Sequence, residues 1–134
     1  MQEKKQVTFA NPPSMPPTNG YTHVVGVRGG RTIYISGQVP VNAGGELVGP
    51  GDLAAQTRQV FENIKAALAA AQASFDDVVK LTFFLTDISR IQIVREIRDQ
   101  YINTQHPPAS SAVEVRKLVN EQFLIEIEAI AIAD

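Results

Sequence analysis

Two carboxylates, Glu126 and Glu128, stand in alternating positions within the stretch from Phe123 to Ala133. Strict alternation is typical of a β-strand, because successive side chains point to opposite faces. One face of this stretch is apolar and fits a protein core, whereas the other combines the two glutamates with Leu124, Ile130 and Ile132. Solvent disfavours so many aliphatic side chains, and a dry core excludes unpaired carboxylates. The mixed face therefore predicts a surface buried against another subunit, with a polar cleft in which a carboxylate could act as an acid or base.

A second candidate lies near the end of the strand predicted over residues 31–38, where Ser36 is followed by Gly37. A small residue next to a glycine lets a ligand approach the backbone closely. We do not expect Ser36 to be a nucleophile, because neither His23 nor His106 has a recognisable spacing from it. The chain contains no cysteine, which excludes a thiolate nucleophile and a cysteine metal site, and we expect no bound metal.

The elements that must position these residues alternate along the chain. Strands are predicted over residues 6–9, 22–28, 31–38, 78–86, 109–118 and 123–133, with Gly29-Gly30 as a two-residue hairpin turn between the second and the third. Helices are predicted over residues 53–72, capped by Asp52, and from a capping box at Ser89 to Gln92 as far as about residue 105.

Two helices of this length can cover only one face of a mixed sheet, which predicts an α+β fold with both helices on that face. Strand parity assigns eleven side chains to the uncovered face: Thr32, Tyr34, Ser36, Thr82, Phe84, Ser110, Ala112, Glu126, Glu128, Ile130 and Ile132. Among them Phe84 is a candidate substrate contact. Since no helix remains to cover this face, we expect other copies of the chain to do so, in a cyclic homo-oligomer with clefts between the subunits.

The first 20 residues are predicted to form an extended arm, followed by a single domain over residues 21–134. Four of the eight prolines lie between Asn11 and Gly20, and such a segment cannot join a central ladder. This segment either wraps the surface as a linker or delivers Tyr21 to a site. Tyr21 would then contact a ligand or a neighbouring subunit.

Composition narrows the classes of function. The chain has 134 residues, of which 44% are hydrophobic and 19% charged, as in an ordinary globular protein. Its formal net charge of −2 gives no basic footprint for nucleic acid or an anionic membrane, so a nucleic-acid partner is not expected. The polar start of the chain leads into no apolar run of signal-peptide type, and we expect a cytoplasmic protein without a membrane partner.

Three segments, taken together, carry a resemblance to a known family: Ile35-Ser36-Gly37-Gln38-Val39-Pro40, Ala112-Val113-Glu114-Val115 and residues 125–131. With them, the chain from Gly20 onward resembles the Rid (YjgF-type) family, also described as the L-PSP endoribonuclease family. The resemblance implies a chorismate-mutase-like fold, a homotrimer and small-molecule clefts between neighbouring subunits. It also implies hydrolysis of reactive imino or enamino acids to 2-oxo acids and ammonia, with no metal or organic cofactor.

The resemblance further implies a set of cleft residues: Tyr21, Ser36, Gly37 and Glu126. Glu126 matches the glutamate that holds or orients the attacking water. Ser110 stands where the imine deaminases have an arginine that grips the substrate carboxylate, and a neutral hydroxyl cannot replace that charged fork. Arg116 has the same strand parity but lies roughly 20 Å further along, which is too far for a substitute within the cleft. We expect Glu128 to form hydrogen bonds across the subunit interface.

These observations leave three hypotheses. The leading one is a trimeric small-molecule-binding protein that hydrolyses an imine or enamine with a non-standard substrate preference. A second, of a different class, is a non-catalytic ligand-sensing or interaction protein that uses the same clefts. A third is an endoribonuclease or translation inhibitor, against which the acidic chain and the lack of a histidine pair argue. Altered specificity and lost catalysis both stay open as readings of Ser110.

Overall fold

The computed structural model describes residues 4–134 of the chain, which form an α+β fold. The elements follow in the order β1 (Gln6–Ala10), β2 (Val24–Arg28), β3 (Arg31–Gln38), α1 (Leu53–Ala70), η1 (Phe75–Asp77), β4 (Val78–Leu85), η2 (Ile88–Arg90), α2 (Ile91–Arg98), β5 (Ala109–Glu114) and β6 (Ile125–Ala133), where η marks a single 3-10 turn. The predicted order of strands and helices is confirmed. The strand predicted to residue 118 ends at Glu114, and the second helix ends at Arg98 rather than near residue 105.

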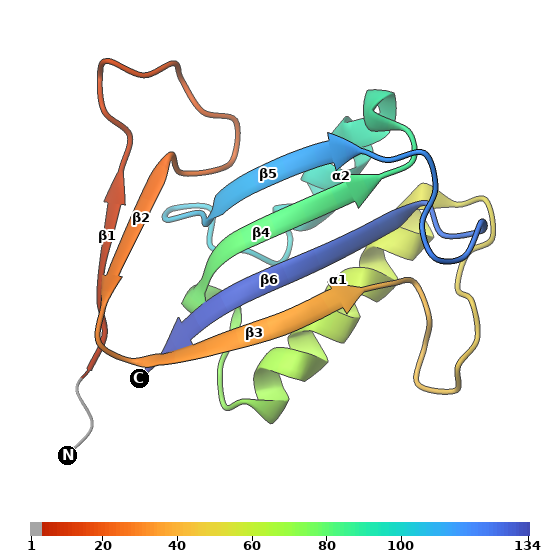
Figure 1. Cartoon of the computed structure of the whole chain (residues 1–134), viewed down its shortest axis with the longest axis horizontal. Coiled ribbons are helices and arrows are strands. Elements are labelled where there is room, and N and C mark those ends of the chain that lie inside the picture. The colour runs from red at the N-terminus through yellow and green to blue at the C-terminus, as the bar shows by residue number, and fades with distance from the viewer. Residues whose placement is uncertain (1–3) are drawn as a thin grey trace.

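Four strands form a mixed sheet in the order β3-β6-β4-β5, with only β4 and β5 parallel. Both helices lie behind this sheet, and β1 and β2 stand beside it as a separate pair (Figure 1). The placement of both helices on one face is thus confirmed. The core lies between the helices and the sheet, and its largest fully buried side chains include Phe61 and Ile64 of α1 and Leu81 of β4.

Helix α1 begins as its sequence predicts. The side chain of Asp52 accepts a hydrogen bond from the backbone N–H of Ala55 at 3.1 Å, which satisfies one of the free donors of the first turn. The start of the second helix differs from the prediction. Asp87 caps the 3-10 turn η2 by accepting from Ser89, and α2 itself has no side-chain cap. The predicted capping box is therefore wrong, because Asp87 offers a charged acceptor before Ser89 can act as the cap.

The Gly29-Gly30 turn joins the two expected strands, and both glycines have positive φ, at 75° and 81°. The predicted hairpin pairing across it is nevertheless wrong, because β2 pairs with β1 while β3 pairs with β6. The turn instead bends the chain between the small strand pair and the main sheet (Figure 1). The division into an arm over residues 1–20 and a domain over residues 21–134 stays a prediction, and residues 1–3 lie outside the described part of the chain.

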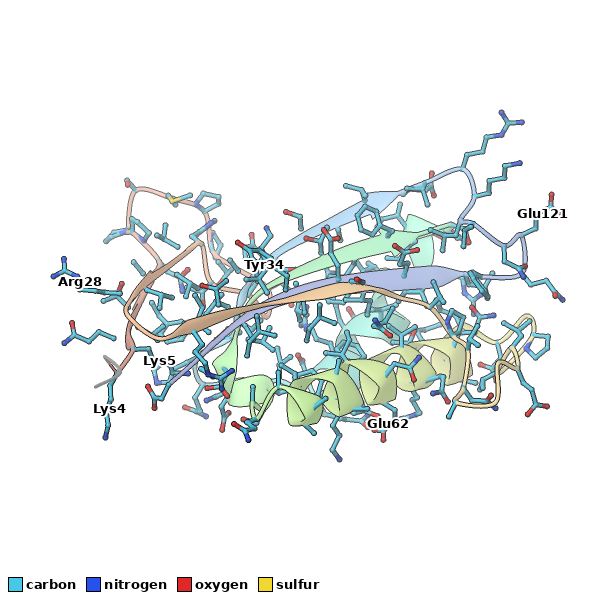
Figure 2. The ribbon with its side chains drawn as sticks, turned by 60° about the horizontal axis from the view of Figure 1, so that its bottom comes forward. Lys4, Lys5, Arg28, Tyr34, Glu62 and Glu121 are labelled. Atoms are coloured by element: carbon cyan, nitrogen blue, oxygen red, sulfur yellow. The ribbon has the colours of Figure 1, made fainter. Side chains whose placement is uncertain are left out.

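One face of the main sheet is covered by the helices and the other is open. The alternation predicted for the final strand is confirmed in β6, where every odd-numbered residue is buried and every even-numbered residue is at least partly exposed. Tyr34 of β3 is 79% exposed on the open face. Figure 2 shows Tyr34 on the opposite side of the sheet from α1, whose Glu62 points away. Within residues 4–134 no helix has the length and hydropathy required to cross a membrane.

Candidate functional site

The predicted site residues fall into two groups on different sides of the sheet. Gly37, Phe84 and Glu126 lie together on the open face, where Ser36 lines a shallow pocket nearby. Tyr21 and Ser110 line a second pocket, formed where the segment before β2 meets β5 and α2.

Glu126 owes its position to an irregularity in the β3–β6 pairing. The register shifts between Ile35 and Gln38, so that Ser36 and Gly37 have no regular partner on β6. The Glu126 side chain fills the space over Gly37, and a Cβ built on Gly37 would lie 2.8 Å from the Cδ atom of Glu126. Glycine at position 37 therefore makes room for this carboxylate.

The Glu126 carboxylate is half-buried and accepts no hydrogen bond from the part of the chain that the structure describes. Phe84 lies directly across from it in the β4–β6 register. The free lone pairs of the carboxylate can accept a hydrogen bond from a water molecule, and the neighbouring apolar ring can contact a small organic group.

A pocket of about 250 Å³ lies further along the open face, and we call it the sheet-face pocket. Its lining includes Tyr34, Ser36, Lys80 and Glu128. Glu128 is exposed, in keeping with a position where a neighbouring subunit could reach it. Its predicted interface hydrogen bonds stay a prediction.

Tyr21 is anchored through its neighbour in the chain. Thr22 is 2% exposed, its hydroxyl donates to the carbonyl of Pro107 at 2.6 Å, and its backbone N–H donates to the carbonyl of Pro108 at 3.2 Å. These two carbonyls come just before β5. The bonds therefore hold Tyr21 against the start of β5, beside a pocket of about 270 Å³ that we call the α2 pocket.

Ser110 lines the α2 pocket, which corrects the side of the sheet predicted for it. In the parallel β4–β5 register, Ser110 is the partner of buried Leu81 and Ala112 is the partner of buried Phe83. Ser110 and Ala112 therefore face α2, while Ser111 and Val113 face the open side. The sequence of β5 is too uniform in polarity to fix its parity, so the alternation alone pointed to the wrong face.

The α2 pocket also contains two arginines that the sequence analysis did not select, Arg95 and Arg98. Arg98 is only 6% exposed, although charged residues are rarely buried. A signal was available, because Arg98 follows Val94 by four residues and so shares the helix face that packs on the core. The lining of this pocket includes no aspartate or glutamate, so its charged lining is entirely cationic.

The two groups cannot act on one small molecule within a single protomer. Ser110 and Glu126 are on opposite faces of the sheet, and Glu126 aligns with Val113 across β4. Two strand spacings of about 4.8 Å and three residues of about 3.3 Å separate their backbones by roughly 14 Å. A shared site would need one group from each of two neighbouring copies.

The two resolved pKa shifts lie outside both groups. Hydrogen bonds from the side chain and backbone of Ser89 lower the pKa of the Asp87 carboxyl. Burial and a hydrogen bond to Glu62 raise the pKa of Tyr101 to about 12. Within residues 4–134 no three His, Asp or Glu side chains are grouped so that they could hold a metal ion.

Comparison with known proteins identifies the family. The family model described as Endoribonuclease L-PSP matches residues 12–133, which is most of the chain. A RutC family protein of Pyrococcus horikoshii is 42% identical over 129 residues, covering 95% of this chain and 97% of that protein. The chain belongs to the Rid family. A Rid family protein of Yersinia pestis, of solved structure, superposes with a TM-score of 0.84 at 38% identity and covers 94% of this chain and 98% of its own.

The Rid relatives include proteins with a named activity. The 2-iminobutanoate/2-iminopropanoate deaminase of Escherichia coli K12 is 42% identical over 114 residues, covering 82% of this chain and 86% of that protein. The mixed sheet with two helices and the superposition on a solved Rid protein agree with the predicted chorismate-mutase-like fold. Both the fold and the family inferred from the sequence are therefore confirmed.

Proposed function

We propose that this Rid protein hydrolyses a reactive imine or enamine to a carbonyl compound and ammonia, in clefts formed between subunits of a homotrimer. The observation that carries the proposal is the Glu126 carboxylate, held over Gly37 beside Phe84 with its lone pairs free. The named deaminase among the relatives supports the reaction class. Ser110 itself offers no charge to a substrate carboxylate, so the substrate preference is expected to differ from that of imine deaminases with an arginine at this position.

The reaction asks little of the protein. A water oxygen adds to the carbon of the C=N bond, and Glu126 accepts a proton from that water and passes it to the nitrogen. Glu126 then takes the hydroxyl proton of the tetrahedral adduct and delivers it to the amino nitrogen, the C–N bond breaks, and ammonia leaves the carbonyl product. Imine and water are thus converted to carbonyl compound and ammonia, with no cofactor in the balance. Glu126 serves as the acid–base group, and the pocket walls orient the substrate.

The same geometry supports the proposed homotrimer. The open face presents two exposed large hydrophobic side chains, Tyr34 at 79% and Val113 at 44% exposure, and no helix covers this face in one protomer. A neighbouring copy on this face would bring its own Tyr21 and Ser110 group toward Glu126. A cyclic arrangement of three copies would form three equivalent clefts. A monomeric mass at micromolar concentration in analytical ultracentrifugation would contradict this part of the proposal.

The activity can be tested by ammonia release from imines that an amino-acid oxidase generates in the assay. We expect wild-type protein to accelerate ammonia release over the uncatalysed rate, and Glu126→Gln to lose about 100- to 10,000-fold of that acceleration, as removal of a general acid–base group does. Glu121→Gln, an exposed glutamate in the turn before β6, is the matched control and should behave as wild type.

Two other outcomes identify the alternatives. Tight binding of a small molecule that depends on Glu126, without any acceleration, would favour the ligand-sensing protein. RNA cleavage that disappears in Glu126→Gln would favour the endoribonuclease, a reading that the description of the family model supports. A cytoplasmic location stays a prediction.

A further inference from the structure

The α2 pocket holds a buried cation whose hydrogen-bonding capacity is mostly unused. The side chain of Arg98 is 7% exposed, and its Nε donates to the Oδ1 of Asp99 at 2.9 Å. Its two terminal nitrogens donate to no residue among positions 4–134. No buried side-chain nitrogen in this range lacks a partner, so these terminal nitrogens keep contact with solvent, and Arg98 is one of the residues that line the α2 pocket.

An anion bound in this pocket would complete the hydrogen bonding of the guanidinium. Removing a guanidinium from water costs free energy that one neighbouring carboxylate offsets only in part, because Asp99 is itself 47% exposed. Arg95 adds a second positive charge to the same pocket. A planar guanidinium with two free N–H groups fits the two oxygens of a carboxylate in a bidentate pair.

We propose that Arg98, assisted by Arg95, binds the carboxylate of the ligand and so supplies from α2 the positive charge that position 110 of β5 lacks. Ser110 of β5 and Arg98 of α2 line the same pocket, so a positive charge that the strand lacks can be supplied by the helix. This inference rests on the proposed function for the identity of the ligand, but it specifies which residue selects an anionic ligand.

The segment before Tyr21 orients this guanidinium. Gly20 has a positive φ of 74°, and a Cβ built on it would lie 2.7 Å from the Cζ atom of Arg98. The guanidinium therefore packs on the backbone of Gly20, and the next residue, Tyr21, lines the same pocket. Because the guanidinium is already held in place, less conformational entropy is lost when a ligand carboxylate binds.

The test is isothermal titration calorimetry with 2-oxobutanoate and its uncharged methyl ester as probes, using the full chain. Wild-type protein should bind the acid about 10- to 100-fold more tightly than the ester, since a charge-assisted hydrogen bond contributes a tenfold change or more. Arg98→Gln should weaken binding of the acid by a similar factor and leave binding of the ester unchanged. Arg90→Gln is the matched control, because Arg90 is exposed just before α2 and does not line the pocket.

A rescue variant separates binding from a general loss of structure. Arg98→Gln combined with Ser110→Arg should recover at least part of the affinity for the acid, because a positive charge returns to the lining of the same pocket. Equal binding of acid and ester by wild type, or unchanged binding of the acid by Arg98→Gln, would overturn the inference. So would inorganic phosphate binding more tightly than the acid, which would indicate a general anion site.

Folding failure and catalytic failure remain distinguishable from failure of the inference. If Arg98→Gln does not fold, Arg98→Lys can replace it. The comparison of acid with ester on wild-type protein needs no variant and still tests whether the pocket selects a carboxylate. If the acid binds through Arg98 but no imine is hydrolysed, the inference stands and the proposed function fails. If imines of charged and uncharged substrates are hydrolysed equally well by wild type and Arg98→Gln, the proposed function stands and the inference fails.

Discussion

Adding a single methyl group at Gly37 should separate catalysis from stability. In Gly37→Ala the new Cβ would lie 2.8 Å from the Cδ atom of Glu126 and 3.1 Å from its Cγ, so the glutamate must turn to another rotamer. The backbone itself tolerates alanine, because Gly37 does not have a positive φ. The substitution therefore moves the carboxylate while leaving the strand intact.

The two energetic consequences nearly cancel for folding. Replacing glycine by alanine at a compatible position stabilises a protein by about 0.4–1 kcal/mol through the unfolded chain. Displacing the glutamate side chain from its preferred rotamer costs at most about 0.5–1.5 kcal/mol, the cost of an off-rotamer side chain. The free energy of unfolding should change by less than about 1 kcal/mol, which corresponds to a change in Tm of about 4 °C. A displacement of the carboxylate by about 1 Å, in contrast, is expected to lower kcat/KM roughly 100-fold.

The assay is ammonia release from an oxidase-generated imine, measured alongside thermal unfolding. Gly44→Ala is the matched control, since a Cβ there meets the carboxylate of Glu46 at 3.3 Å but in an exposed loop far from Glu126 in the chain. The decisive measurement is the double variant Gly37→Ala/Glu126→Ala. If Gly37 acts only by making room for Glu126, the double variant should be no less active than Glu126→Ala alone. Multiplicative losses in the double variant would refute this reasoning.

Two further predictions concern residues away from the clefts. Gln56 is fully buried in α1 and accepts a hydrogen bond from the backbone N–H of Leu124 at 2.7 Å. Gln56→Leu should therefore lower the free energy of unfolding in urea by about 1–3 kcal/mol. The control Gln92→Leu, on the exposed side of α2, should change it by less than about 0.5 kcal/mol. Equal effects of the two would show that this buried hydrogen bond does not matter. Tyr101 should ionise with a pKa of about 12, which an ultraviolet pH titration would detect as a transition missing in Tyr101→Phe. Because its folded pKa lies above the ordinary value of 10.0, its contribution to stability should be complete below pH 10 and lost as the pH rises through about 12. A Tyr101→Phe titration identical to that of wild type would contradict the assignment.

The elements of the fold could be read from the sequence because their periodicities are strong. The final strand alternates without a break, and α1 carries a continuous buried stripe after a clear Asp52 cap. Strand pairing was harder, as the Gly29-Gly30 turn illustrates. Two glycines predict a change of direction, but the partner of each strand depends on contacts distant in sequence, and these gave β2 to β1 and β3 to β6.

The candidate site could be predicted only where side-chain pattern and register agreed. Alternation placed Glu126 on the open face, but its grouping with Gly37 was implied only by the family resemblance, because the register shift that brings them together cannot be read from alternation. Ser110 went to the wrong face because the alternation of β5 contains no large hydrophobic residue on the helix side. Arg98 was missed because charge favours solvent, and only its helical spacing from Val94 placed it on the buried face.

The position of β6 between β3 and β4 also constrains how the protein can be made. β6 is the last of the described elements in the chain, yet it lies between β3 and β4 in the sheet. β3 forms its ladder hydrogen bonds only with β6, and β4 forms them with β6 and β5. During synthesis on the ribosome, β3 therefore has no partner in the main sheet until the segment from Ile125 to Ala133 has emerged. The nascent chain must carry unpaired strand edges for most of its translation, which makes it dependent on rapid completion and exposed to aggregation until then.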